Sequence, residues 1–138
     1  IPVVIGTTGQ TGEDEEMMQL LGKICPVDRK ANYSRGIGAV SQIAPEVSAL
    51  LPGSDIAIEE IHHNKKKDAP SGTAKTLCDI LHVPYSSAVS MRIGTVPGEH
   101  RICFALEDEV IEIIHRAFSK KIFAIGAIEA GKSMIKID

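Results

Sequence analysis

The residue types most suited to chemistry gather in one short segment, residues 60–74. Two adjacent imidazoles, His62 and His63, can move protons near neutral pH. The ammonium groups of Lys65–Lys67 can attract a carboxylate, and the free amides of a helix that opens at Ser71 can bind an anion. The segment therefore predicts a site for a small molecule that carries several negative charges and exchanges a proton.

Each part of this segment also has a plain structural explanation. A run such as Lys65–Lys67 is often an ordinary solvated surface, and a single histidine is usually a core or surface residue. A functional site is favoured over these structural explanations because the lysines stand between two histidines and a helix start. There Ser71 can cap the helix, Gly72 lets a ligand approach the backbone and Thr73 adds a hydroxyl. Zinc is not expected, because no carboxylate or cysteine stands at i+4 from the histidines and the ammonium groups repel a cation.

The two histidines follow a strand expected over residues 54–61, in which Ile56, Ile58 and Glu60 share one face. Side chains alternate along a strand, so one imidazole should face the cleft and the other the opposite side. Only one of the two histidines is therefore expected to move the proton.

The start of the chain has the pattern of a nucleotide-binding α/β unit. The apolar run 1–5, closed by Gly6-Thr7-Thr8-Gly9, predicts a buried parallel strand and a turn. Thr11 can cap a helix that reaches Gly22 and has an acidic first turn, and a short strand is expected within 24–31. Strand, turn and helix in this order are typical of the last unit of such a fold.

The rest of the chain predicts a second, mixed layer. We expect a loop at 32–36, a helix at 37–51 that Pro45 should kink or split, a helix at 72–82, strands at 87–93, 99–107 and 109–118, and a helix at 120–132. The change from alternating elements to consecutive strands predicts an α/β (α+β) fold: the end of a Rossmann-type domain, then a mixed sheet of about four strands with helices on one face.

Composition and charge argue against a nucleic-acid-binding protein and against a membrane-spanning one. The 138 residues carry a net charge of −3, which gives no general attraction to nucleic acid, and no apolar run approaches the ~20 residues of a membrane span. The separated cysteines Cys25, Cys78 and Cys103 indicate reduced thiols in a cytoplasmic protein. Because the chain starts inside an apolar run without methionine, we expect missing N-terminal sequence.

The motif resembles the signature of the dihydrodipicolinate (4-hydroxy-tetrahydrodipicolinate) reductase family. In that signature a double histidine is followed by a lysine four residues after the first histidine, and then by Asp-Ala-Pro-Ser-Gly-Thr-Ala. This chain has His62, His63, Lys66 and the same seven residues at 68–74. Further matches run in the family's order: Gly6-Thr7-Thr8-Gly9, Asn32-Tyr33-Ser34, Arg92 before Gly98-Glu99-His100, and Ile114-His115-Arg116-Ala117.

The resemblance implies an NADH- or NADPH-dependent reductase of a cyclic dicarboxylate in lysine biosynthesis, assembled as a homotetramer. His62 would be the general acid, Lys66 would assist it, and His63 would line the pocket. A substrate carboxylate would be held by Ser71, Gly72 and Thr73. The implied contacts to the nicotinamide end of the cofactor are Gly6, Thr7, Thr8, Ala31 and Tyr33, with Arg92 closing the site near the cofactor. Neither a metal, a nucleic acid nor a membrane is implied as a partner.

Several departures from the family pattern leave two interpretations. The family's Gly-x-x-Gly-x-Met-Gly phosphate loop has no counterpart, the link from Leu81 to Arg92 is short, and Pro45 is unusual. We favour a reductase of which the chain holds part, with little NAD(P)H affinity of its own; the alternative is a non-catalytic dicarboxylate-binding or assembly module. Expected boundaries are 1–31 for the nucleotide-binding part, 32–119 for the substrate and oligomerisation domain, and 120–138 for a C-terminal helix that returns to the first part.

Overall fold

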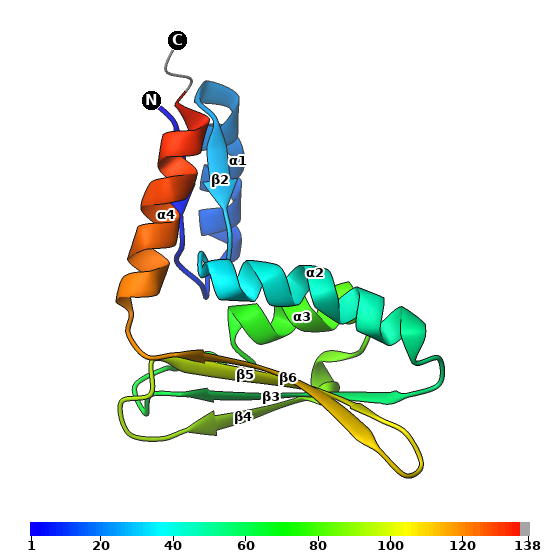
Figure 1. Cartoon of the computed structure of the whole chain (residues 1–138). Helices are drawn as coiled ribbons and strands as arrows, with labels where there is room; N and C mark the ends of the chain where they lie inside the picture. The colour runs from blue at the N-terminus through cyan, green and yellow to red at the C-terminus, as the bar shows by residue number, and fades with distance from the viewer. Residues whose placement is uncertain (136–138) are drawn as a thin grey trace.

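A computed structural model describes residues 1–135 and has two parts set at an angle to one another (Figure 1). The elements are β1 (Val3–Ile5), α1 (Gly12–Ile24), β2 (Val27–Arg29), α2 (Arg35–Leu50), β3 (Asp55–His62), α3 (Gly72–Leu81), a 3₁₀ turn (Tyr85–Ser87), β4 (Ala88–Arg92), β5 (Gly98–Ala105), β6 (Val110–Ala117) and α4 (Lys121–Met134). The last three residues of the expected segment 120–138 lie outside the described residues. Among the helices of residues 1–135, none has the length and apolarity needed to cross a membrane.

The smaller part is a β-α-β unit. Strands β1 and β2 pair in parallel, with Val3 opposite Val27, and α1 connects them. A capping box fixes the start of α1: the Thr11 hydroxyl accepts from the Asp14 amide, while the Asp14 carboxylate accepts from the Thr11 amide at 2.7 Å. Helix α4 packs on β1, although it comes last in the chain. The strand, helix and strand predicted at the chain start are confirmed.

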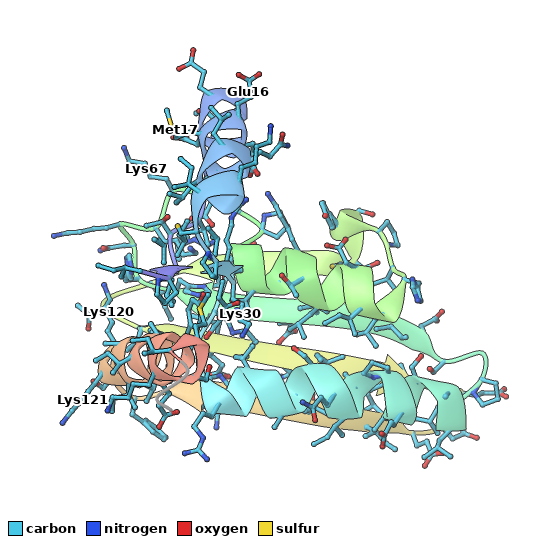
Figure 2. The ribbon with its side chains drawn as sticks, turned by 90° about the horizontal axis from the view of Figure 1, so that it is seen from above. Glu16, Met17, Lys30, Lys67, Lys120 and Lys121 are labelled. Carbon is cyan, nitrogen blue, oxygen red and sulfur yellow. The ribbon has the colours of Figure 1, made fainter. Side chains whose placement is uncertain are left out.

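The larger part is a four-stranded mixed sheet in the order β4-β3-β5-β6. Strand β3 pairs in parallel with β4 and antiparallel with β5, and β5 forms an antiparallel hairpin with β6. Helices α2 and α3 lie side by side over one face of the sheet (Figures 1 and 2). Their inward side chains meet the sheet in one aliphatic core, made by Val40, Ala44, Ile58, Ala74, Leu77, Cys78, Leu81, Ile102 and Phe104. The predicted fold class, with about four strands and helices on one face, is confirmed.

Helix α2 differs from the prediction at Pro45. The helix is continuous from Arg35 to Leu50, so Pro45 does not split it. A proline removes one helical hydrogen bond and crowds the preceding turn. Val40 and Ala44 before the proline and Val47 after it all pack against the larger core, which supports the helix on both sides of Pro45.

Residues 32–34 join the two parts of the molecule. Asn32 donates to the Thr73 hydroxyl at 3.1 Å, and the Ser34 hydroxyl, which caps α2, lies 3.1 Å from His115 Nε2. On the other side Gly126 of α4 is packed directly on the Tyr33 carbonyl, since a Cβ built on Gly126 would lie 1.8 Å from that oxygen. The loop is therefore held by α3, β6 and α4 at once.

This packing predicts that Gly126→Ala lowers the free energy of unfolding by about 1–3 kcal/mol, because the new methyl group meets rigid backbone. Gly131→Ala is the matched control on the same helix, since its Cβ would make an ordinary 3.6 Å contact with Val4. Alanine is the better helix former by about 1 kcal/mol, so the control should be neutral or stabilising. Chemical denaturation of both variants measures the difference; equal stabilities would contradict the close approach of α4 to Tyr33.

Candidate active site

A cavity of about 360 Å³ opens where the two parts of the molecule meet. The smaller part and the joining loop contribute five lining residues: Gly6, Thr8, Ala31, Asn32 and Tyr33. The larger part contributes His62, His63, Lys66, Ser71, Gly72, Thr73 and Pro97, and helix α4 with its N-cap adds Lys120, Phe123 and Ala127. The cavity thus collects residues that are distant in sequence, and most of the predicted site residues are among them.

The end of β3 places His62 on the cavity wall beside a buried carboxylate. Residues two apart on a strand share a face, so Glu60 and His62 both point inward, and His62 Nδ1 lies within hydrogen-bond distance of Glu60 Oε2. Arg92 of β4 donates to both carboxylate oxygens, at 2.9 and 2.7 Å. Burial alone would raise the pKa of Glu60, but the hydrogen bonds from His62 and Arg92 outweigh it and hold the pKa well below its ordinary value.

His63 lies in the cavity as well, which corrects the expectation that the two imidazoles face opposite sides. The last register pair of β3 is His62 with Arg92, and the chain then turns, with the Lys66 amide bonded to the His63 carbonyl. Strand alternation therefore ends before His63. Desolvation lowers the pKa of His63, and the positive charges of Lys120, His62 and Lys66 lower it further.

Lys66 is the lysine of the run that enters the cavity, while Lys65 and Lys67 are exposed. Its ammonium lies 2.9 Å from Asp68 Oδ1. Burial would raise the pKa of Asp68, but the hydrogen bond from Lys66 lowers it, with help from the backbone amides of Asp68 and Gly72. Lys66 thus already holds a carboxylate at the cavity wall.

The start of α3 forms another wall of the cavity. Ser71 is its N-cap, accepting from the Ala74 amide at 3.2 Å, as predicted. Gly72 is pressed against the smaller part: a Cβ there would lie 2.9 Å from Thr8 Cγ2 and 3.1 Å from Ala31 Cβ. A side chain at this position would fill the junction, so glycine lets the helix amides face the cavity.

Two of the predicted cofactor-binding residues lie elsewhere. Thr7 lines a neighbouring cavity, together with Thr8, Ala31 and Gly72. Arg92 does not line the main cavity; its guanidinium is engaged by Glu60 and by the Asp68 carbonyl, to which it donates at 2.6 Å. Within residues 1–135 no three metal-ligating side chains are grouped as a metal site would require.

Sequence reasoning missed Glu60, His100 and Lys120 as site residues. His100 is buried beneath His62, with ring centroids 5.1 Å apart and its Nε2 3.3 Å from the Ser71 hydroxyl. Its other nitrogen, Nδ1, has no partner among the described residues. The period of two along β3 could have revealed Glu60, whereas His100 and Lys120 reach the site only through long-range packing.

Comparison with known proteins identifies similar sequences and a similar fold. The family model described as "Dihydrodipicolinate reductase, C-terminus" matches residues 36–137. The 4-hydroxy-tetrahydrodipicolinate reductase of Thermosipho africanus is 41% identical over 133 residues, which cover 96% of this chain and 61% of the relative. The Staphylococcus saprophyticus enzyme of the same name is 38% identical over 156 residues, covering 99% of this chain and 65% of the relative.

The solved structure of dipicolinate-bound dihydrodipicolinate reductase from Paenisporosarcina sp. TG-14 superposes with a TM-score of 0.66 at 22% identity, over 99% of this chain and 61% of that one. The chain thus spans about three fifths of the length of the relatives it matches. The alignment with the S. saprophyticus relative runs over more positions than the 138 residues of this chain, so that relative has residues without a counterpart here.

The buried imidazole of His100 predicts a specific dependence of stability on pH. Desolvation and the nearby His62 lower the pKa of His100 from 6.5 to about 3. Between these values the unfolded chain binds a proton that the folded chain does not, so stability present above pH 6.5 is lost as the pH falls.

His100→Gln should show a shallower loss of unfolding free energy over this range, as measured by denaturation at pH steps from 6.5 to about 4. Other shifted groups, such as Glu60 and Asp68, are common to both proteins, so the difference between the two curves reports His100. His82→Asn, at an exposed position, is the control and should follow the wild-type curve. Parallel curves for all three proteins would contradict a buried neutral His100.

Proposed function

Because this chain belongs to the dihydrodipicolinate reductase family, we propose that it carries the substrate site for NAD(P)H-dependent reduction of 4-hydroxy-tetrahydrodipicolinate to tetrahydrodipicolinate, on the diaminopimelate route to lysine. One observation carries the proposal. A single cavity combines an imidazole, an ammonium group and the start of a helix, which are the groups needed to bind a dicarboxylate and protonate it.

Substrate binding is assigned to Lys66 and to the start of α3. The Lys66 ammonium would exchange Asp68 for a substrate carboxylate, and the backbone amides of Gly72 and Thr73 would bind the same or the second carboxylate. Ser71 keeps the helix start in place, and His63 lines the same cavity. The match to a reductase whose solved structure holds dipicolinate, a flat ring with two carboxylates, supports this substrate class.

His62 is the proposed general acid. Its Nδ1 is engaged by Glu60, which leaves Nε2 for a substrate bound in the cavity that His62 lines. Reduction of the substrate ring needs a hydride and a proton, and the proton would come from this nitrogen.

The residues proposed for the cofactor fit its nicotinamide end. Gly6, Thr8, Ala31 and Tyr33 line the same cavity as His62 and come from the smaller part and the joining loop. NADH or NADPH supplies the hydride when bound. The close contact of Gly72 with Thr8 and Ala31 leaves the two walls near one another, which is the arrangement that transfer between a cofactor and a substrate requires.

We also propose that the chain assembles as a homotetramer through the outer face of its sheet, the face that α2 and α3 leave uncovered. Val89 of β4 is exposed there, in register across the sheet with the exposed Ile114 of β6, and Met91 of β4 is exposed on the same face. Val89→Glu should reduce the assembly measured by sedimentation velocity, because a charge would be buried in the interface. Leu50→Glu, at an exposed apolar residue on the end of α2, should not. A monomeric wild-type protein would refute the assembly.

The proton-donor role is tested by His62→Gln in the protein expressed from its whole reading frame. We expect kcat for NADH or NADPH oxidation with substrate to fall about 10²–10⁴-fold, since a general acid contributes a factor of this size. The affinity for the dicarboxylate should change little, because Lys66 and the helix amides remain. An unchanged kcat would exclude His62, whereas a wild-type protein that binds the dicarboxylate without any turnover would favour a non-catalytic binding module.

A further inference from the structure

Glu60 is the most completely buried charged side chain of the site, with 0% of its surface exposed. Four groups donate to its carboxylate: His62 Nδ1, two nitrogens of Arg92 and the Ser71 amide, the last at 3.2 Å. These donors come from β3 itself, from β4 and from the start of α3. Both oxygens of Glu60 are therefore fully engaged by groups that surround the cavity.

The carboxylate of Glu60 determines which ring nitrogen of His62 carries the proton. A carboxylate accepts hydrogen bonds and cannot donate one, so His62 must carry its proton on Nδ1 to satisfy Glu60. The other ring nitrogen, Nε2, is then the one that faces the cavity, close to Gly98, where a Cβ would lie 3.2 Å away. A larger residue at Gly98 would cover this nitrogen.

Arg92 completes the arrangement. Its guanidinium holds Glu60 as a planar, two-bond pair and donates a further bond to the Asp68 carbonyl, which fixes the carboxylate in one orientation. A buried carboxylate without such a partner would take up a proton, and it could no longer serve as an acceptor for the imidazole. Arg92 therefore keeps Glu60 in the form that His62 requires.

We propose that Glu60 and Arg92 form a positioning pair, which holds the His62 imidazole with its proton on Nδ1 and its Nε2 directed at the substrate. This inference rests on the proposed function, in which His62 is the proton donor. Neither residue of the pair contacts the cavity, so both act through His62. The carboxylate also stabilises the imidazolium form of His62, the form that has a proton on Nε2 to give.

The remaining groups around His62 cannot replace this pair. His100 of β5 packs edge-on against the imidazole without a hydrogen bond to it, and Lys66 and His63 from the following loop are positive or neutral. The Lys66 ammonium repels an imidazolium at His62, and the neutral imidazoles of His63 and His100 do not stabilise it. Glu60 is thus the single carboxylate among the described residues that contacts His62.

A purely structural pair would hold β3, β4 and the loop at Asp68 together without affecting proton transfer. Removing a structural pair would leave the tautomer of His62 and kcat unchanged, whereas removing a positioning pair would change both. The test uses the double variant Glu60→Leu/Arg92→Met, because Glu60→Gln alone would leave the largely buried Arg92 without its charged partner. Replacing both members of a buried ion pair by apolar groups of similar size is commonly tolerated by the fold. Glu46→Gln is the control, since Glu46 is an exposed glutamate on α2, away from both the cavity and the outer face of the sheet.

The readouts are the ¹⁵N signals of the His62 ring, which report the tautomer, and the kinetics of the enzyme expressed from its whole reading frame. The wild-type protein and Glu46→Gln should carry the neutral-form proton on Nδ1, while the double variant should shift to Nε2. The kcat of the double variant should fall at least about tenfold, with the affinity for pyridine-2,6-dicarboxylate changed less than about threefold.

A folded double variant in which His62 keeps its Nδ1 proton would overturn the inference. So would a changed tautomer with an unchanged kcat, because the pair would then be structural only. If the wild-type protein shows the Nδ1 proton but no turnover with either nucleotide, the proposed function fails while the geometry of the pair stands.

Discussion

A carboxylate with no exposed surface, that of Glu60, is the constraint on which the site depends. Burying an unpaired charge is strongly unfavourable, so the structure must bring donors to it. Those donors are His62, Arg92 and the Ser71 amide, which set the positions of β3, β4 and the start of α3 relative to one another. Removing one member of such a group typically costs about 3–5 kcal/mol, whereas replacing the whole group costs much less. Stability and site geometry are therefore linked through one side chain.

The second constraint is the junction between the two parts of the molecule. The cavity has walls from both, and residues 32–34 hold the walls together through Thr73, His115 and Gly126. The small residues at this junction, above all Gly72, allow the helix amides of α3 to approach the turn that follows β1. The cavity therefore brings the Lys66 ammonium and the helix amides of the larger part close to the turn and the loop of the smaller part.

Local signals in the sequence predict the elements and the immediate ligand-binding groups. The cap at Ser71 and the close approach at Gly72 follow from spacing and residue type, whereas the choice of Lys66 among the three lysines follows from the resemblance to the family signature. The period of two along β3 correctly places Ile58 and Glu60 inside. Sequence could not reveal that Arg92 binds Glu60 rather than a cofactor, or that His100 lies beneath His62, since both depend on strand pairing far along the chain. Strand alternation predicts opposite sides for His62 and His63, and this fails because the strand ends at His62; the place in the pocket that the family resemblance implies for His63 agrees with the cavity lining.

The central claim is that Lys66 and the start of α3 bind a dicarboxylate. Titration of the chain with pyridine-2,6-dicarboxylate, followed through its backbone amide NMR signals, tests this most directly. We predict saturable shifts that are largest at Gly72 and Thr73, with affinity reduced at least about tenfold in Lys66→Ala and by less than about twofold in Lys67→Ala, whose lysine is exposed. Shifts that do not saturate, that centre away from the start of α3, or that are weakened equally by both substitutions would contradict the account.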